Sequence, residues 1–160
     1  MDNIIKENMF IDFLVRAKRN TYAAQGDESS VEPVLIGSKQ LEYEEGSLFY
    51  RDIYFGFVAF VGQEVVYNNM SPIWSMVYAG KTYKEYESVV KINEIYRFLR
   101  ITLQEIQKKA PYRGPSECNS GDFRYINKIK GDIPDFDGVE KIYFKGKLVY
   151  KLDYSGGRVE

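Results

Sequence analysis

Four consecutive segments with a hydrophobic period of two dominate the first half of the chain. A period of two is typical of β-strands, and strands joined by short turns pair with antiparallel neighbours. The turn residues Glu44-Glu45-Gly46-Ser47 and Asn68-Asn69-Met70-Ser71-Pro72 separate these segments. The segments are 41–43, 48–55, 57–67 and 73–79. This pattern predicts an antiparallel meander rather than βαβ units.

Helical spacing of apolar residues flanks the meander on both sides. Ile4 to Ala17 predicts a helix that ends near Asn20, and Tyr86 to Ile106 predicts a second helix that stops before Pro111. Strands are expected over 123–129, 141–144 and 147–154, the last two joined by a Lys145-Gly146 turn. No internal repeat is evident. The sequence therefore predicts an α+β fold, a curved antiparallel sheet of about seven strands with two helices packed on one face, forming a single domain over residues 1–160.

Composition excludes several classes of function. The 160 residues include 22 basic and 23 acidic side chains, one cysteine and no histidine. Without histidine, a Cys/His zinc site and a Ser-His nucleophile are excluded, and Cys118 is not expected to be a nucleophile. The charge balance does not favour direct nucleic-acid binding, and no apolar run approaches the ~20 residues of a membrane span. We expect a cytoplasmic protein with no metal or other cofactor.

Strand alternation places a set of aromatic and acidic side chains together. Tyr50, Asp52 and Tyr54 share one face of the segment 48–55. Glu64 lies on one face of the segment 57–67, and Trp74 and Tyr78 share one face of the segment 73–79. If these faces coincide, they form an aromatic surface that holds two carboxylates. Apolar walls with a few placed polar groups are typical of small-molecule sites. The predicted ligand-binding residues are Tyr50, Asp52, Tyr54, Glu64, Trp74, Tyr78 and Arg113.

Arg113 enters this set from the loop Tyr112-Arg113-Gly114-Pro115, where Gly and Pro hold the backbone. Its guanidinium is suited to bind a carboxylate or phosphate group of a ligand, and the alternative is that it ties the loop to Asp52 or Glu64.

Structural roles compete with the ligand-binding interpretation. Because structural ion pairs also perturb pKa values, we favour a structural role for Asp52 and Glu64, in which they pair with Arg51, Arg113 or Arg124 or face water, over a catalytic one. For Trp74, Met76 and Tyr78 we favour a sheet core under a helix over a ligand wall. The basic run Arg16-Ala17-Lys18-Arg19 is typical of a solvated helix end.

A scattered motif resembles a known family. Its residues are Gly37-Ser38, Leu41-Glu42-Tyr43, Tyr50, Asp52, Tyr54, Gly62-Gln63-Glu64, Pro72, Trp74, Met76, Tyr78 and Gly80, with Phe13 to Lys18 and Tyr112 to Pro115 on either side. The chain resembles the uncharacterised bacterial family called domain of unknown function 5680, which in some members follows a helix-turn-helix. This resemblance implies ligand sensing or assembly. Because no helix-turn-helix precedes Gly37, direct DNA binding is not expected.

Three hypotheses of function follow. The leading hypothesis is a sensory or binding domain that takes a small polar ligand on the aromatic and acidic sheet face. The second is a metal-free hydrolase or transferase with Asp52 and Glu64 as an acid–base pair. The third is a protein-interaction module whose aromatic surface or last hairpin docks a partner or a second copy of the chain, as in a homodimer.

Overall fold

Eight strands and two long helices account for most of the chain that the computed structural model describes, residues 2–25 and 28–160, with side chains described for 6–24 and 28–160. The helices are α1 (Asp2–Asn20), α2 (Tyr22–Gln25) and α3 (Ile92–Gln104), with a short 3-10 turn η1 (Lys84–Tyr86). The strands are β1 (Lys39–Glu45), β2 (Leu48–Gly56), β3 (Ala59–Asn68), β4 (Ser71–Thr82), β5 (Glu117–Ser120), β6 (Phe123–Asp132), β7 (Asp135–Phe144) and β8 (Lys147–Arg158).

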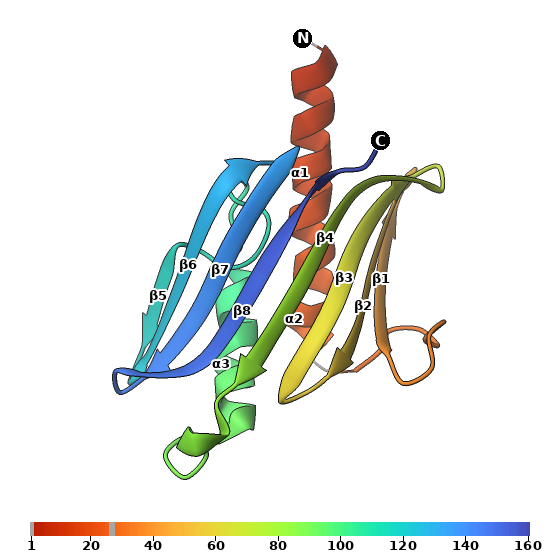
Figure 1. Ribbon diagram of the computed structural model, residues 1–160. Helices are drawn as coiled ribbons and strands as arrows, with labels where there is room; N and C mark the ends of the chain where they lie inside the picture. The colour runs from red at the N-terminus through yellow and green to blue at the C-terminus, as the bar shows by residue number, and fades with distance from the viewer. Residues whose placement is uncertain (1, 26–27) are drawn as a thin grey trace.

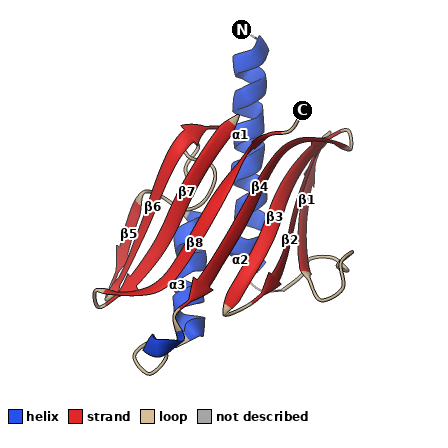
Figure 2. Ribbon diagram, viewed as in Figure 1, coloured by secondary structure: helices blue, strands red, loops and turns tan. Residues whose placement is uncertain are grey.

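The strands form one antiparallel sheet in the order β1-β2-β3-β4-β8-β7-β6-β5. Figure 1 shows β4 and β8 at the centre of the sheet, and Figure 2 shows α1, α2 and α3 on the same side of it. The inner face, which the helices cover, carries the buried core, including Trp74, Tyr50, Tyr125 and Tyr150. The α+β fold class and the one-sided packing of the helices are confirmed. None of the described helices combines the length and apolar character needed to cross a membrane.

The second half of the sheet has one more strand than predicted, and its strands extend further. Strand β5 has only four mostly polar residues, too few for alternation to reveal, so the sheet has eight strands rather than about seven. Strand β7 begins before the predicted residue 141 and includes Gly138, and β8 extends past the predicted residue 154 through Gly156-Gly157. Pro134 lies in the turn between β6 and β7. The helix predicted over 86–106 begins only at Ile92 and ends at Gln104, because η1 and an irregular segment cover residues 84–91.

The fold is an approximate two-fold repeat of a helix followed by a four-stranded meander. Four backbone features of the first half recur in the second. Gly46 and Gly56 have positive φ, as do Gly121 and Gly131; Asn69-Met70 and Lys145-Gly146 also have positive φ at equivalent hairpins. The register shifts at Val66/Tyr67 in one half and at Ile142/Tyr143 in the other.

The equivalent tyrosines Tyr78 and Tyr154 pair directly across β4 and β8. A rotation axis between these two strands therefore relates the halves. This repeat is missing from the sequence prediction because few of the equivalent positions hold identical residues. Those that do include Tyr50 with Tyr125, Gly62 with Gly138, and Glu64 with Glu140.

Candidate functional site

The predicted residues of the first half share the inner face of the sheet. Asp52 lies opposite Glu64, Tyr50 opposite Val66, and Tyr54 opposite Gly62, which in turn faces Tyr78. Trp74 follows on the same face, opposite Val66. The register that alternation required is the one observed. The six predicted side chains on this face are buried, because α1, α2 and α3 cover it; they are Tyr50, Asp52, Tyr54, Glu64, Trp74 and Tyr78.

Glu64 is paired with Lys18, which sequence reasoning assigned to a solvated helix end. Lys18 is only 8% exposed, and its ammonium donates to Glu64 and to the Tyr112 carbonyl oxygen at 2.6 Å. Burial lowers the pKa of Lys18, and the charge of Glu64 opposes this effect. The suggested partners lie elsewhere: Arg51 contacts Glu42, and Arg124 contacts Glu117. The signal for Lys18 was its helical spacing from Leu14 and Thr21, both of which are buried.

Asp52 has no cation of its own among the described residues. Its carboxylate accepts a hydrogen bond of 2.7 Å from the Tyr78 hydroxyl and is 3% exposed. Burial raises the pKa of Asp52 to about 7, with a further contribution from the charge of Glu64; the Tyr78 hydrogen bond and the charges of Lys18 and Arg113 oppose the shift. Asp52 therefore exchanges its proton near neutral pH, where an ordinary aspartate is fully ionised.

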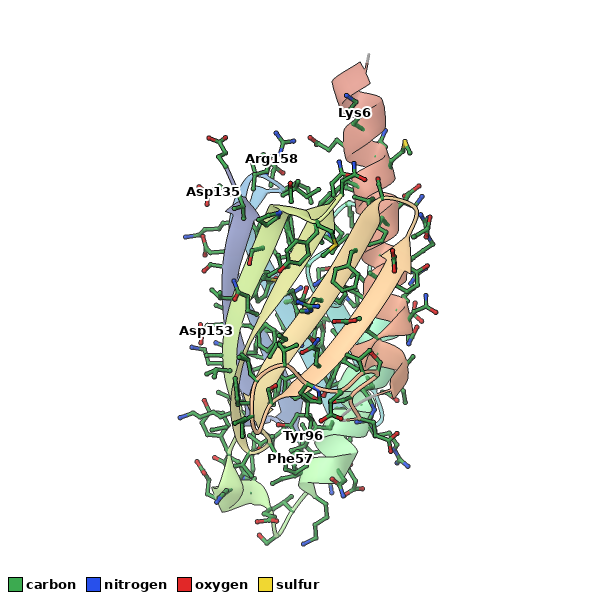
Figure 3. The ribbon with its side chains drawn as sticks, turned by 90° about the vertical axis from the view of Figure 1, so that its right-hand side faces the viewer. Lys6, Phe57, Tyr96, Asp135, Asp153 and Arg158 are labelled. Atoms are coloured by element: carbon green, nitrogen blue, oxygen red, sulfur yellow. The ribbon has the colours of Figure 1, made fainter. Side chains whose placement is uncertain are left out.

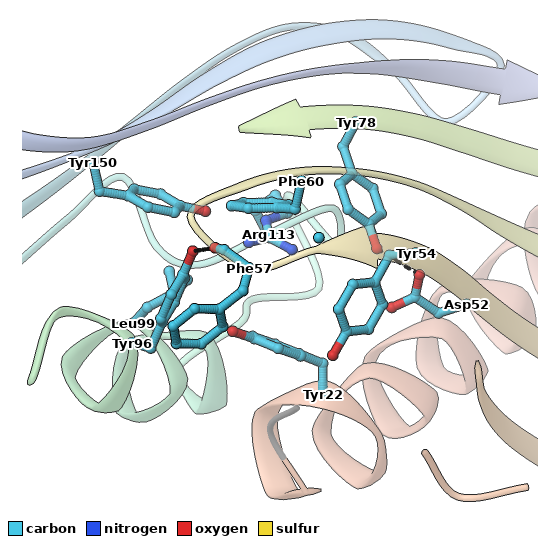
Figure 4. Close-up of a pocket in the computed structure, with 11 residues that line it drawn as sticks. Tyr22, Asp52, Tyr54, Phe57, Phe60, Tyr78, Tyr96, Leu99, Arg113 and Tyr150 are labelled. Carbon is cyan, nitrogen blue, oxygen red and sulfur yellow. Dashed lines mark hydrogen bonds between the residues drawn. The ribbon is translucent and has the colours of Figure 1, made fainter. Parts of the chain in front are cut away.

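Asp52 faces a cavity with aromatic walls (Figure 4). Its lining residues are Tyr22, Asp52, Tyr54, Gly56, Phe57, Phe60, Tyr78, Tyr96, Leu99, Arg113 and Tyr150. The volume open to the centres of water molecules is ≈ 30 Å³. Since one water needs about 10–15 Å³ of such volume, there is room for about two waters. A smaller space of ≈ 20 Å³, lined by Lys18, Tyr50 and Glu64, lies on the other side of Asp52.

The cavity reaches the surface at the turn between β2 and β3. Of its lining residues, Gly56 and Phe57 are exposed. The Tyr96 hydroxyl donates to the Phe57 carbonyl oxygen, which ties this turn to α3. Figure 3 shows Phe57 and Tyr96 together, at the opposite end of the molecule from Lys6. Gly56 has φ 92°, and a Cβ there would lie 2.1 Å from the Ala59 carbonyl oxygen, so the turn requires glycine.

Arg113 belongs to a second buried centre. Its Nε and Nη2 donate to the two carboxylate oxygens of Glu140 at 3.1 and 2.8 Å. The hydroxyls of Tyr125 and Tyr150 donate to the same carboxylate at 2.5 and 2.7 Å. Arg113 therefore holds its loop to Glu140 rather than to Asp52 or Glu64, and its fork is occupied. Glu140 was not predicted because Gly138 hid the alternation of Phe136, Gly138, Glu140 and Ile142 along β7.

Trp74 lies apart from the cavity. Its ring stacks on Phe136 at a centroid distance of 5.6 Å and is fully buried, and it lines neither space beside Asp52. The structure thus brings Asp52, Tyr54, Tyr78 and Arg113 together around one cavity. It places Tyr50 and Glu64 around the smaller space. The aromatic residues Tyr22, Phe57, Phe60, Tyr96 and Tyr150 of the cavity wall were not predicted.

Comparison of the chain with curated proteins and with solved structures finds no match. The family model described as a domain of unknown function, DUF5680, matches residues 52–159, from Asp52 in β2 to the end of β8. This match covers more than half of the chain and agrees with the resemblance seen in the sequence motif. The chain therefore belongs to the DUF5680 family, a family defined as a domain of unknown function.

Proposed function

We propose that the chain is a binding or sensory domain that takes a small polar ligand in the cavity between Asp52 and Phe57. One observation carries the proposal: a buried carboxylate without a cationic partner among the described residues faces a cavity with aromatic walls. A buried charge costs stability unless it is paired, so a fold gains nothing from Asp52 in this position by itself. A buried carboxylate of this kind beside a cavity is typical of a functional site.

The second half of the sheet supports this reading, because it solves the same packing problem without the carboxylate. Asn127 lies opposite Glu140 as Asp52 lies opposite Glu64. The Tyr154 hydroxyl donates to Asn127 Oδ1 at 2.8 Å, as Tyr78 donates to Asp52 Oδ1 at 2.7 Å. A neutral amide therefore fills the structural role of this position, and the negative charge of Asp52 is available for a ligand.

The cavity limits the part of a ligand that enters it. Space for about two waters accommodates a small molecule or the polar head of a longer one. A longer ligand would leave past Gly56 and Phe57, and a bulkier head would require the β2–β3 turn to move. Protein docking on the aromatic face is not supported, because the helices cover Tyr50, Tyr54, Trp74 and Tyr78.

The test is native against denaturing mass spectrometry of freshly purified protein, followed by a small-molecule screen that records thermal unfolding. Asp52→Asn removes the carboxylate, and Asp137→Asn makes the same change on the exposed face of β7. We expect an extra mass, or a stabilising compound, with wild type and Asp137→Asn but not with Asp52→Asn. A ligand that binds all three proteins equally, or no ligand from either experiment, would contradict the proposal.

A second candidate is acid–base catalysis, which the environment of the two carboxylates favours. Glu64 forms a buried ion pair with Lys18. Burial and the charge of Glu64 raise the pKa of Asp52 to about 7, a value suited to a general acid at neutral pH. A hydrolase or transferase of this kind would show a bell-shaped pH–rate profile that Asp52→Asn abolishes. If the compounds found in the screen bind but are not turned over, catalysis is contradicted and the binding function stands.

A further inference from the structure

The two buried centres of the sheet differ by one negative charge. In the second half, the bidentate contact between Arg113 and Glu140 is neutral, and the adjacent Asn127 adds no charge. This centre is complete, because Tyr125 and Tyr150 saturate the carboxylate. A ligand has no unpaired charge to meet there.

The first half keeps the paired arrangement and adds a charge. Lys18 and Glu64 form a neutral pair, and Asp52 stands where the second half has an asparagine. Ionised Asp52 therefore gives the cavity one uncompensated negative charge among the described buried groups. The complement of that charge is a cation that enters the cavity.

The walls of the cavity also favour a cation. Phe57, Phe60 and Tyr96 line the same cavity as Asp52 (Figure 4). The ring of Tyr54, which also lines it, already has the Lys39 ammonium 5.8 Å from its centroid. The face of an aromatic ring attracts a cation, and the attraction grows when water is removed. An anionic ligand meets the opposite conditions, because the Asp52 charge repels it and Glu140 already occupies the fork of Arg113.

We propose that the cavity binds a protonated primary amine, whose ammonium group donates hydrogen bonds to the Asp52 carboxylate and lies against the aromatic rings. The volume of ≈ 30 Å³, enough for about two waters, suits an ammonium group. Any alkyl tail would pass out by Gly56 and Phe57. This inference rests on the proposed function and adds to it the charge class of the ligand.

The test uses methylammonium as the probe and the amide NMR spectrum of the full chain as the readout, at constant ionic strength. Methanol is the neutral probe of similar size, and acetate is the anionic probe. We expect saturable shifts at residues 52–60 and at Tyr78 with methylammonium alone, at millimolar concentration because so small a ligand binds weakly. Binding should be several-fold tighter at about pH 8 than at about pH 5, where Asp52 is protonated. Asp52→Asn should lose the shifts and Asp137→Asn should keep them.

Each other outcome has a definite meaning. Saturable shifts at the same residues with methanol or acetate, but not with methylammonium, would overturn the charge class and leave the proposed function standing. Shifts with no probe would overturn the amine proposal, and the mass spectrometry and the screen would then judge the binding function separately. Methylammonium shifts of equal strength at both pH values would show that Asp52 does not bind the probe, even if Asp52→Asn fails to fold.

Discussion

Asp52 in the first half of the sheet and Asn127 in the second occupy equivalent positions. Each accepts a hydrogen bond from an equivalent tyrosine two strands away, Tyr78 in β4 or Tyr154 in β8. The two tyrosines pair across the centre of the sheet. The halves thus share a hydrogen-bonded framework, and the chemistry that differs between them is the carboxyl group of Asp52.

Lys18 is expected to be required for stability. Lys18→Met leaves Glu64 buried without its cation, and breaking a buried pair costs about 3–5 kcal/mol in the free energy of unfolding. Arg16 on the same helix is the control, because its ion pair with Glu45 is exposed and Arg16→Met should change stability far less. Urea denaturation measures both. Equal effects of the two substitutions would show that the buried pair is not a structural requirement.

Glu140 is expected to be required as well. Glu140→Gln leaves the Arg113 charge buried and weakens the hydrogen bonds from Tyr125 and Tyr150, so the free energy of unfolding should fall by about 3 kcal/mol or more. Glu117→Gln removes the same charge from an exposed pair with Arg124 and serves as the control. A Glu140→Gln protein as stable as the Glu117→Gln protein would contradict the assignment of a structural centre.

Gly62 and Gly138 are expected to tolerate no side chain. A Cβ at Gly62 would lie 2.3 Å from the Tyr78 hydroxyl oxygen, and a Cβ at Gly138 would lie 2.2 Å from the Tyr154 ring. Each glycine lets a tyrosine cross the strand to reach Asp52 or Asn127. We expect Gly62→Ala and Gly138→Ala each to lower the free energy of unfolding by about 1–3 kcal/mol. Only Gly62→Ala should also disturb ligand binding, and unchanged melting temperatures would contradict the equivalence of the halves.

The sequence predicted the architecture and part of the site because both depend on local periodicity. Alternation in β2, β3 and β4 identifies which side chains share a face, and it brought Asp52 and Glu64 together correctly. It did not identify Lys18, whose burial depends on how α1 packs on the sheet. Nor did it identify Glu140, because the expected strand 141–144 begins one residue after it, whereas β7 begins at Asp135. The cavity wall combines residues from α2, α3 and β8 with the first meander, which no local pattern relates.

Tyr78 is expected to set the proton affinity of Asp52. Its hydrogen bond lowers the pKa of Asp52 against the larger effect of burial, so Tyr78→Phe should raise that pKa above about 7. Tyr154→Phe is the matched control, since it removes the hydrogen bond to Asn127 and leaves Asp52 untouched. A carbon-detected NMR titration of the Asp52 carboxyl group measures both variants. An unchanged or lowered pKa in Tyr78→Phe would contradict the assigned contact.

The pH dependence of stability should carry the signature of Asp52. Burial and the charge of Glu64 raise its pKa from 3.8 to about 7, against the opposing effects of Tyr78, Lys18 and Arg113. Between these values the unfolded chain has lost the Asp52 proton and the folded chain has kept it, so the free energy of unfolding falls as pH rises from about 4 to about 7. Above pH about 7 both states are ionised at Asp52, and the contribution is constant.

The most direct test of the central claim, that Asp52 serves binding rather than folding, is the free energy of unfolding of wild type and Asp52→Asn at about pH 5 and about pH 8. We expect Asp52→Asn to gain stability relative to wild type as pH rises, by on the order of 2–4 kcal/mol, and to be at least as stable as wild type at the higher pH. Asp137→Asn should show no such gain. An Asp52→Asn protein that is much less stable than wild type at both pH values would show that the carboxylate is structural and would contradict the account.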